Sequence, residues 1–274
     1  MRHWVLITGC STGIGRALVP LCRLAGWGVV ATARRTETLA DLPPGEDLRV
    51  LALDVTDAAS IAAAVEACAD LRLKALVNNA GYGQVGPLEL LRAEELRAQF
   101  ETNVIGLQMV TNAFLPLLRR ERGARILQVA SMLGRLSIPL AGAYNASKHA
   151  VVALAESLRL EVGREVAVVL VEPGAIRTAF RQTLAQMWGD LPERGRGTRW
   201  EKVLARHMAV RQERADRYAM DAEPCARRIV NALNAAVPPR RVVIGKDAFW
   251  AGKLRAILPE ALWERILRRA YRLN

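Results

Sequence analysis

A tyrosine and a lysine one helical turn apart are the residues of this chain best suited to proton transfer. The segment Tyr144-Asn145-Ala146-Ser147-Lys148 is predicted to open a helix, and a spacing of four residues places Tyr144 and Lys148 on one face. A phenol with its ordinary pKa of about 10 is a poor acid–base catalyst near neutrality, and lowering that pKa to ~7 requires about 4 kcal/mol. A neighbouring ammonium supplies part of that energy. An ordinary amphipathic helix face is the alternative for this pair taken alone.

Ser131 lies 13 residues before Tyr144, directly after a predicted strand at 125–130. Its hydroxyl is placed to hydrogen-bond a substrate carbonyl or alcohol oxygen.

A glycine-rich turn, Thr8-Gly9-Cys10-Ser11-Thr12-Gly13-Ile14-Gly15, lies between the first predicted strand and the first predicted helix. Its three glycines allow a tight turn and a close approach of backbone to ligand, and the helix N-terminus adds free N–H groups and a positive dipole end. This combination favours a diphosphate site. The spacing differs from the general G-x-G-x-x-G dinucleotide pattern, so an ordinary glycine turn remains the alternative.

The end of the second strand carries arginines where NAD-binding proteins usually carry an acid. That acid lies about 20 residues after the glycines and accepts from the ribose 2′-hydroxyl. Here Ala33 occupies the position, and Arg34 and Arg35 follow it. Because a guanidinium pairs with a 2′-phosphate, we expect NADP(H) to be preferred, NAD(H) to be the second choice, and Arg34 to make the contact. Two solvated arginines at a strand end are the alternative.

Strands and helices alternate along the chain, which predicts a parallel sheet covered on both faces. The expected elements are strands at 4–8, 28–33, 48–53, 75–77, 125–130, 166–171 and 242–245, and helical stretches at 14–24, 58–68, 88–120, 144–162 and 224–236, with helical segments to the end. We therefore expect an α/β, Rossmann-type, doubly wound parallel sheet of about seven strands. One domain spans 1–274, with a cofactor-binding and catalytic core at 4–180 and a substrate loop and basic helical extension at 175–274.

Composition excludes several classes of protein. The chain has 274 residues, of which 51% are hydrophobic and 24% charged, and this excludes intrinsic disorder. Four widely spaced cysteines exclude a disulfide scaffold, and three scattered histidines lead us to expect no metal. The N-terminal apolar run is too short for a signal peptide, so a cytoplasmic location is expected.

The order and spacing of these motifs, together with Asn78-Asn79-Ala80-Gly81, Asn103-Val104-Ile105-Gly106 and Pro173-Gly174, resemble the short-chain dehydrogenase/reductase family over roughly residues 4–180. Within it the chain looks most like the 17β-hydroxysteroid and retinol dehydrogenases. The resemblance implies that Tyr144 is the general acid or base, that Lys148 lowers its pKa and holds the nicotinamide ribose, that Ser131 orients the substrate oxygen, and that Asn103 holds a relay water. It also implies a cofactor-binding set: Gly9, Ser11, Thr12, Gly13, Ile14, Gly15, Arg34, Asp54, Val55, Asn79, Ala80, Gly81, Tyr144, Lys148, Pro173, Gly174, Ile176 and Thr178.

The predicted substrate is a lipophilic carbonyl or alcohol, because apolar side chains flank the expected site. They are Met132, Leu133, Leu136, Ile138, Pro139 and Leu140, with Phe180, Leu184, Met187 and Trp188 from the substrate loop. Ordinary core packing of these side chains is the alternative. A catalytically silent NAD(P)-binding sensor or interaction protein is the second hypothesis for function. The intact set of Asn103, Ser131, Tyr144 and Lys148 argues against it, because a silent protein need not keep all four.

The net charge of +12 is concentrated in the last third of the chain. Residues 1–190 hold 20 Lys/Arg and 18 Asp/Glu, whereas residues 191–274 hold 19 and 9. Residues 254–273 follow a helical period with an apolar stripe (Leu254, Leu258, Leu262, Ile266 and Ala270) and an arginine stripe. Residues 253–274 therefore either contact a membrane surface or pack on the core with the arginines in water. We expect no nucleic-acid partner and a homodimer or homotetramer.

Overall fold

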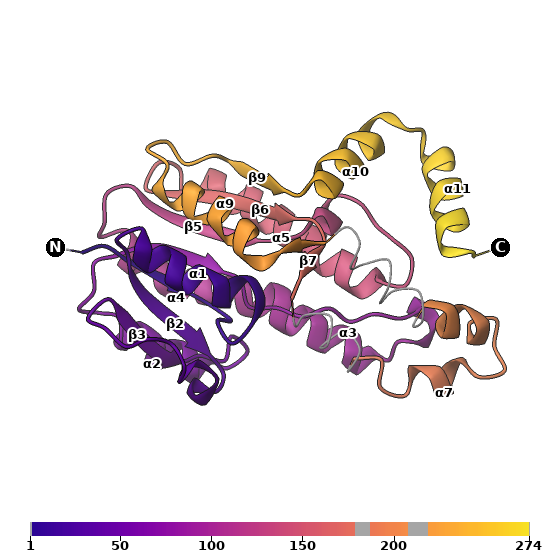
Figure 1. Cartoon of the computed structure of the whole chain (residues 1–274), viewed down its shortest axis with the longest axis horizontal. Coiled ribbons are helices and arrows are strands. Elements are labelled where there is room, and N and C mark those ends of the chain that lie inside the picture. The colour runs from indigo at the N-terminus through magenta and orange to yellow at the C-terminus, as the bar shows by residue number, and fades with distance from the viewer. Residues whose placement is uncertain (1, 179–186, 208–218, 274) are drawn as a thin grey trace.

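Seven parallel strands form the centre of the molecule (Figure 1). The structure is a computed structural model and describes residues 2–178, 187–207 and 219–273. The strand order is β3-β2-β1-β4-β5-β6-β9. The bounds are β1 Trp4–Ile7, β2 Gly28–Ala33, β3 Leu48–Ala52, β4 Leu73–Asn78, β5 Ala124–Val129, β6 Val166–Pro173 and β9 Arg241–Ile244. The predicted doubly wound sheet is confirmed, and every predicted strand is present.

Burial on both faces explains why these strands read as continuous apolar runs. Every residue of β2 and of β5 is buried. A parallel sheet needs cover on both sides, because the helices that connect its strands lie on its faces. The order reverses between β1 and β4, and open α/β sheets bind ligands outside the carboxyl ends of the strands at such a point.

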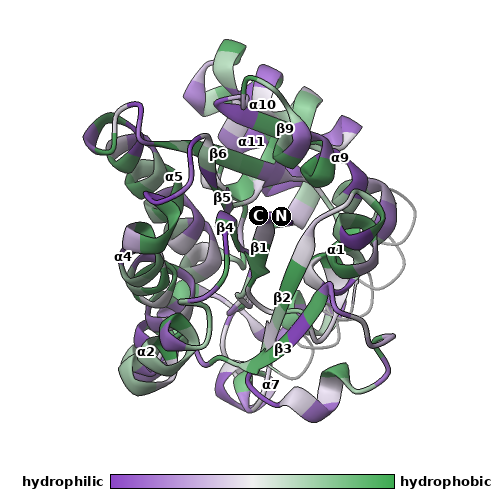
Figure 2. Ribbon diagram, turned by 90° about the vertical axis from the view of Figure 1, so that its left-hand side faces the viewer, coloured by the Kyte–Doolittle hydropathy of each residue, from purple (hydrophilic) through white to green (hydrophobic). Residues whose placement is uncertain are grey.

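Two layers of helices cover the sheet (Figure 2). α1 (Gly13–Leu24) and α9 (Ala222–Asn234) pack on one face around a core that includes Leu18 and Ile229. α2 (Ala58–Glu66), α4 (Leu107–Leu118) and α5 (Gly142–Glu161) pack on the other, around Phe114 and Val151. Asp57 caps α2 by accepting from the Ala59 amide.

The helical region predicted at 88–120 is divided into shorter pieces. A 3₁₀ turn, η2, covers Leu88–Leu90, α3 covers Ala93–Phe100, a π-helical turn covers Glu101–Gly106, and α4 follows. Leu91 and Arg92 are extended, and the Glu95 carboxylate accepts from the Arg92 amide, which fixes the start of α3. A π-turn inside a helix commonly marks a functional position, and this one contains Asn103.

The last third adds small elements at the carboxyl end of the sheet. They are the two-stranded pair β7 (Ile176–Arg177) and β8 (Met220–Asp221), and the helices α7 (Leu191–Gly195), α10 (Lys246–Ile257) and α11 (Glu260–Tyr271). The helical period predicted at 254–273 is interrupted, because Leu258 and Pro259 are extended and separate α10 from α11. Phe180 and Leu184 lie outside the described residues. Among the described helices, none is long and apolar enough to cross a lipid bilayer.

Candidate active site

The glycine turn joins β1 to α1 and is held against the loop that follows β4. Gly9 and Gly13 have φ of +72° and +62°, which favour glycine. A Cβ on Gly9 would lie 2.9 Å from the Ala80 Cα, and one on Gly15 would lie 2.3 Å from the Gly9 carbonyl oxygen. Gly9, Gly15 and Ala80 are therefore packed closely together.

The N-terminus of α1 has the properties of a phosphate site. Thr12 occupies the cap position in an extended conformation, but its side chain makes no capping hydrogen bond, and the first turn contains no acid. The N–H groups of the first turn, which includes Ile14, have no internal partner in a helix. Ser11 is exposed beside them. Free N–H donors at a helix N-terminus without an acidic neighbour fit a dinucleotide diphosphate.

Thr8 is a positioning residue that sequence reasoning missed. Its Oγ1 accepts from the backbone amides of Asn79 and Ala80, both at 2.9 Å, and the Asn79 amide group donates to the carbonyl oxygens of Thr8 and Gly9. These bonds tie the ends of β1 and β4 together. The signal was present in the sequence, because a threonine at the end of an apolar strand carries the polar group that such a junction needs.

Asn103 joins the loop after β4 to the helix that carries the tyrosine. Its Oδ1 accepts from the Tyr82 amide at 3.0 Å, and its Nδ2 donates to the Tyr82 carbonyl at 2.9 Å and to the Ser147 hydroxyl at 3.2 Å. A Cβ on Gly81 would lie 3.0 Å from the Asn103 Oδ1, so these groups are in contact. Asn103 is fully buried. The water-relay role that the resemblance implies stays a prediction.

The three remaining candidate catalytic residues converge beyond β5. Ser131 follows the strand, is 8% exposed and accepts from the Leu133 amide at 3.1 Å, which begins the 3₁₀ turn η4 (Met132–Gly134). Its side chain also hydrogen-bonds to Tyr144. The Lys148 ammonium donates to the Val129 carbonyl at 2.9 Å and lies 5.8 Å from the centre of the Tyr144 ring. The predicted one-turn spacing therefore does bring Tyr144 and Lys148 together.

Burial governs the pKa values of this pair. It raises the pKa of Tyr144 to about 12, although the hydrogen bond from Ser131 acts in the opposite direction. It also lowers the pKa of Lys148 to about 8, because a buried ammonium loses hydration. The protein's own groups therefore keep the phenol protonated at neutral pH, and they do not produce the lowering of its pKa that the sequence suggests.

The ends of β2 and β3 bring an arginine and an aspartate together. Arg34 is exposed directly after β2. The Thr56 amide, which donates to Asp54 Oδ1 at 2.9 Å, is the main cause of the lowered pKa of Asp54, and the charge of Arg34 adds to it. The N-cap of α2 is Asp57, so the Asp54 carboxylate is not used as a helix cap. Val55 is buried, and a Cβ on Gly106 would lie 2.6 Å from its carbonyl oxygen.

A second missed residue, Asp247 in α10, holds the turn after β6. Its carboxylate accepts from the Ala175 amide at 2.6 Å, and a Cβ on Gly174 would lie 2.1 Å from it. Pro173 ends β6, and Ile176 lies in β7. A Cβ added to Gly13 would lie 3.2 Å from the Thr178 side chain. This predicted segment therefore does reach the glycine turn. Asp247 lies 72 residues after Ala175 in the sequence, and no local pattern marks it.

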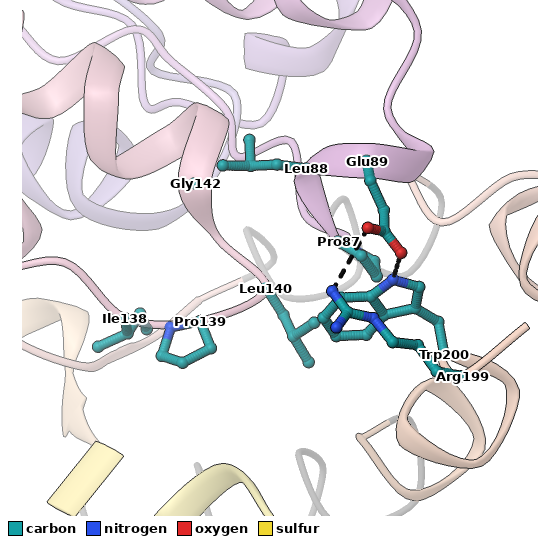
Figure 3. Close-up of a pocket in the computed structure, with 9 residues that line it drawn as sticks. All are labelled: Pro87, Leu88, Glu89, Ile138, Pro139, Leu140, Gly142, Arg199 and Trp200. Atoms are coloured by element: carbon teal, nitrogen blue, oxygen red, sulfur yellow. Dashed lines mark hydrogen bonds and ion pairs between the residues drawn. The ribbon is translucent and has the colours of Figure 1, made fainter. Parts of the chain in front are cut away.

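A pocket of about 340 Å³ opens beside the first turn of α5, which carries Tyr144 (Figure 3). Its lining is mostly apolar and comprises Pro87, Leu88, Glu89, Ile138, Pro139, Leu140, Gly142, Arg199 and Trp200. Glu89 contacts both Arg199 and Trp200 at one end. Leu140 has φ +62°, a strained conformation held by its carbonyl accepting from the Gly86 amide at 2.9 Å.

The expected apolar lining is therefore divided between the pocket and the core. Ile138, Pro139 and Leu140 line the pocket, whereas Trp188 is buried in a small cluster with Val85, Leu191 and Leu204. Within the described part of the chain, no group of three or more His, Cys, Asp or Glu side chains is arranged to hold a metal ion.

Comparison with known proteins gives a consistent result. The chain matches the short chain dehydrogenase family over residues 3–188. It is 36% identical to 17-beta-hydroxysteroid dehydrogenase type 1 of Mus musculus, over 86% of this chain and 72% of that protein. A short chain dehydrogenase of Burkholderia cenocepacia in complex with NADP superposes with a TM-score of 0.75 at 26% identity, over 97% of this chain and 98% of that one. A short chain dehydrogenase/reductase of Burkholderia phymatum in complex with NAD gives 0.79 at 26%, over 93% of each chain. The chain belongs to the short-chain dehydrogenase/reductase family of oxidoreductases, which act on CH–OH groups with a nicotinamide dinucleotide.

Proposed function

We propose that this oxidoreductase interconverts a lipophilic carbonyl compound and its alcohol with NADP(H), and that Tyr144 transfers the proton. The observation that carries the proposal is the hydrogen bond between Ser131 and Tyr144, with the Lys148 ammonium 5.8 Å from the phenol ring. The glycine turn and the N-terminus of α1 supply a diphosphate cradle on the same edge of the sheet.

The side chains divide the chemistry between them. Ser131 donates to the substrate oxygen, and Tyr144 gives its proton to that oxygen in reduction or removes it in oxidation. Since burial raises the pKa of Tyr144 to about 12, the phenol carries the proton that reduction consumes, but it becomes an efficient donor only when this pKa is lowered. The nicotinamide supplies the hydride and, when oxidised, a positive charge that favours the phenolate. Lys148 binds the nicotinamide ribose, and Asn103 holds the backbone at Tyr82 beside Ser147.

The cofactor preference follows from the end of β2. Ala33 provides no carboxylate for a ribose hydroxyl, and the exposed Arg34 supplies a cation near Asp54. Arg34→Ala is expected to raise the KM for NADPH at least tenfold and to leave the KM for NADH within about twofold, since a charge-assisted phosphate contact contributes about 1.5–3 kcal/mol. Arg122→Ala, at an exposed site far along the chain, is the control. An unchanged ratio of the two KM values would exclude Arg34 as the 2′-phosphate ligand.

The substrate class follows from the pocket beside α5. Its apolar lining favours a hydrophobic ligand, and the similarity to a hydroxysteroid dehydrogenase supports a steroid-, retinoid- or lipid-like compound. The test follows NADPH absorbance with hydrophobic ketones, retinal and small water-soluble ketones. The proposal predicts the highest kcat/KM for a hydrophobic member of the panel. A clear preference for small polar ketones would contradict the substrate class but not the reaction.

Oligomeric state and location stay predictions. A homodimer or homotetramer is expected from the family resemblance, and sedimentation velocity of the purified chain measures it.

A further inference from the structure

The C-terminal helices expose an apolar surface that the fold leaves uncovered. Half of the large hydrophobic side chains that are exposed among the described residues lie between 249 and 266, namely Phe249, Trp250, Leu254, Ile257, Leu262 and Ile266. Ile257 is 78% exposed and Trp250 is 59% exposed. Isolated apolar residues on a surface are ordinary, whereas a contiguous set marks an interaction site.

The exposed residues of α10 form a single face. Trp250, Lys253, Leu254 and Ile257 follow the i, i+3, i+4, i+7 pattern of one helical stripe, and all four are exposed. The Lys253 ammonium lies 4.5 Å from the centre of the Phe249 ring and 5.7 Å from that of Trp250, so the cation and the aromatic side chains share this face.

α11 has exposed apolar side chains of its own and adds charge. No residue of α11 is buried, so the apolar stripe does not pack on the core, which was the alternative for this segment. Its inner side is fixed to the protein body through Tyr271, whose ring stacks on His207 at 5.9 Å. Between residues 246 and 273 there are seven Lys/Arg and three Asp/Glu, and Arg265, Arg268 and Arg269 are exposed beside Leu262 and Ile266.

We propose that α10 and α11 dock this protein onto the surface of an anionic lipid bilayer, with the apolar face inserted among the lipids and the cations at the headgroups. Mixed aromatic, aliphatic and cationic faces of this kind bind membrane interfaces, and basic residues near anionic lipids strengthen the binding.

Charge distinguishes this occupant from the other candidates. A second copy of the chain would place two surfaces of the same positive sign against each other. A nucleic acid would pair with the arginines but would leave Ile257, Leu262 and Ile266 without an apolar partner. Of these three occupants, an anionic lipid surface is the one that complements both the charge and the apolar side chains.

The docking would bring the catalytic edge of the sheet toward the lipid. α10 begins directly after β9, holds the turn after β6 through Asp247, and places Gly252 near Arg135, where a Cβ would be 3.8 Å from the guanidinium. Arg135 directly follows η4, which begins next to Ser131. This orientation goes beyond the proposed reaction, and the docking does not depend on it.

Co-sedimentation of the full chain with vesicles tests the proposal. We expect binding to phosphatidylcholine vesicles that contain phosphatidylglycerol, little binding to phosphatidylcholine alone, and weaker binding at high salt. Arg268→Gln/Arg269→Gln is expected to lower the partition coefficient about 25-fold, since each cation near the surface contributes about fivefold. Trp250→Ser/Ile257→Ser is expected to lower it at least tenfold.

Matched controls lie elsewhere on the surface. Leu24 and Leu160 are more than 80% exposed, and Arg122 and Arg164 are exposed arginines outside the C-terminal helices. Leu24→Ser/Leu160→Ser and Arg122→Gln/Arg164→Gln should change vesicle binding by less than twofold. NADPH oxidation with a water-soluble substrate should be unchanged in every variant, so failure of docking and failure of the proposed reaction are separately visible.

Two results would overturn the proposal. Equal losses in the C-terminal variants and their controls would mean that the overall charge of the protein, and not this surface, binds the lipid. The second result has two parts: the parent protein does not bind vesicles, and light scattering gives a lower mass for Trp250→Ser/Ile257→Ser than for the parent protein. It would identify the surface as an interface between two copies.

Discussion

Replacing Lys148 by methionine should abolish catalysis and stabilise the protein. Lys148 is 5% exposed, and burial lowers its pKa from the ordinary 10.5 to about 8. At about 1.4 kcal/mol per pH unit, burying the charged form costs roughly 3 kcal/mol at neutral pH. Methionine removes this cost and also removes the hydrogen bond to the Val129 carbonyl, which contributes about 1 kcal/mol. The net gain is about 2 kcal/mol, or about 4–8 °C in Tm.

The pH dependence gives the sharper test. Between pH 8 and 10.5 the unfolded chain binds more protons than the folded protein at this site, so the wild type gains stability as the pH rises through this window. The advantage of Lys148→Met should therefore be greatest below pH 8 and absent at pH 10.5. Urea unfolding of both proteins at several pH values measures it, and the exposed Lys202→Met should change stability by about 0.5 kcal/mol or less. A difference that does not vary with pH would refute the reasoning.

Three further results are expected. Burial raises the pKa values of the four cysteines from 9.0 to about 11–12, so these thiols should not react with a thiol reagent until the chain unfolds. In thermal melts, the stability that the protonated thiols contribute should be lost as the pH rises from 9 toward 12. Arg241→Met should cost about 3–5 kcal/mol by leaving the buried Glu172 carboxylate short of a partner, and adding Glu172→Gln should recover most of this loss in urea unfolding. Asp247→Ala should weaken NADPH binding measured by fluorescence, because the Ala175 amide loses its acceptor, whereas Asp247→Asn should bind nearly as the wild type.

The sheet was predictable because its strands are short apolar runs buried on both faces. The predicted strand at 28–33 matches β2 at both ends, and the others differ by one or two residues. The helical boundaries were harder to predict wherever tertiary contacts set them. The interruption at 91–92 depends on Glu95 bonding to the Arg92 amide, and the π-turn places Asn103 toward Tyr82. Periodicity alone does not contain either contact.

The candidate site was predictable where its motifs are local. A short stretch of sequence is enough to recognise the glycine turn, the Tyr144/Lys148 pair and Ser131. The structure brings these groups to one edge of the sheet. Asp247 was not predictable, because its role depends on α10 meeting the turn after β6. The raised pKa of Tyr144 was also missed, since it depends on burial that only the folded chain creates.

The break between α10 and α11 had a sequence signal that the periodic pattern concealed. Pro259 cannot continue a helix through Leu258, and the structure ends α10 at Ile257.

The Tyr144→Phe variant tests the central claim most directly, because it removes one hydroxyl and leaves the ring in place. Tyr144 should be the only proton donor to the substrate oxygen, so NADPH oxidation with the best hydrophobic ketone should fall at least 10²–10⁴-fold. NADPH affinity, measured by fluorescence titration, should stay within about threefold, since the diphosphate cradle is untouched. Turnover near the wild-type rate with normal NADPH binding would contradict the account.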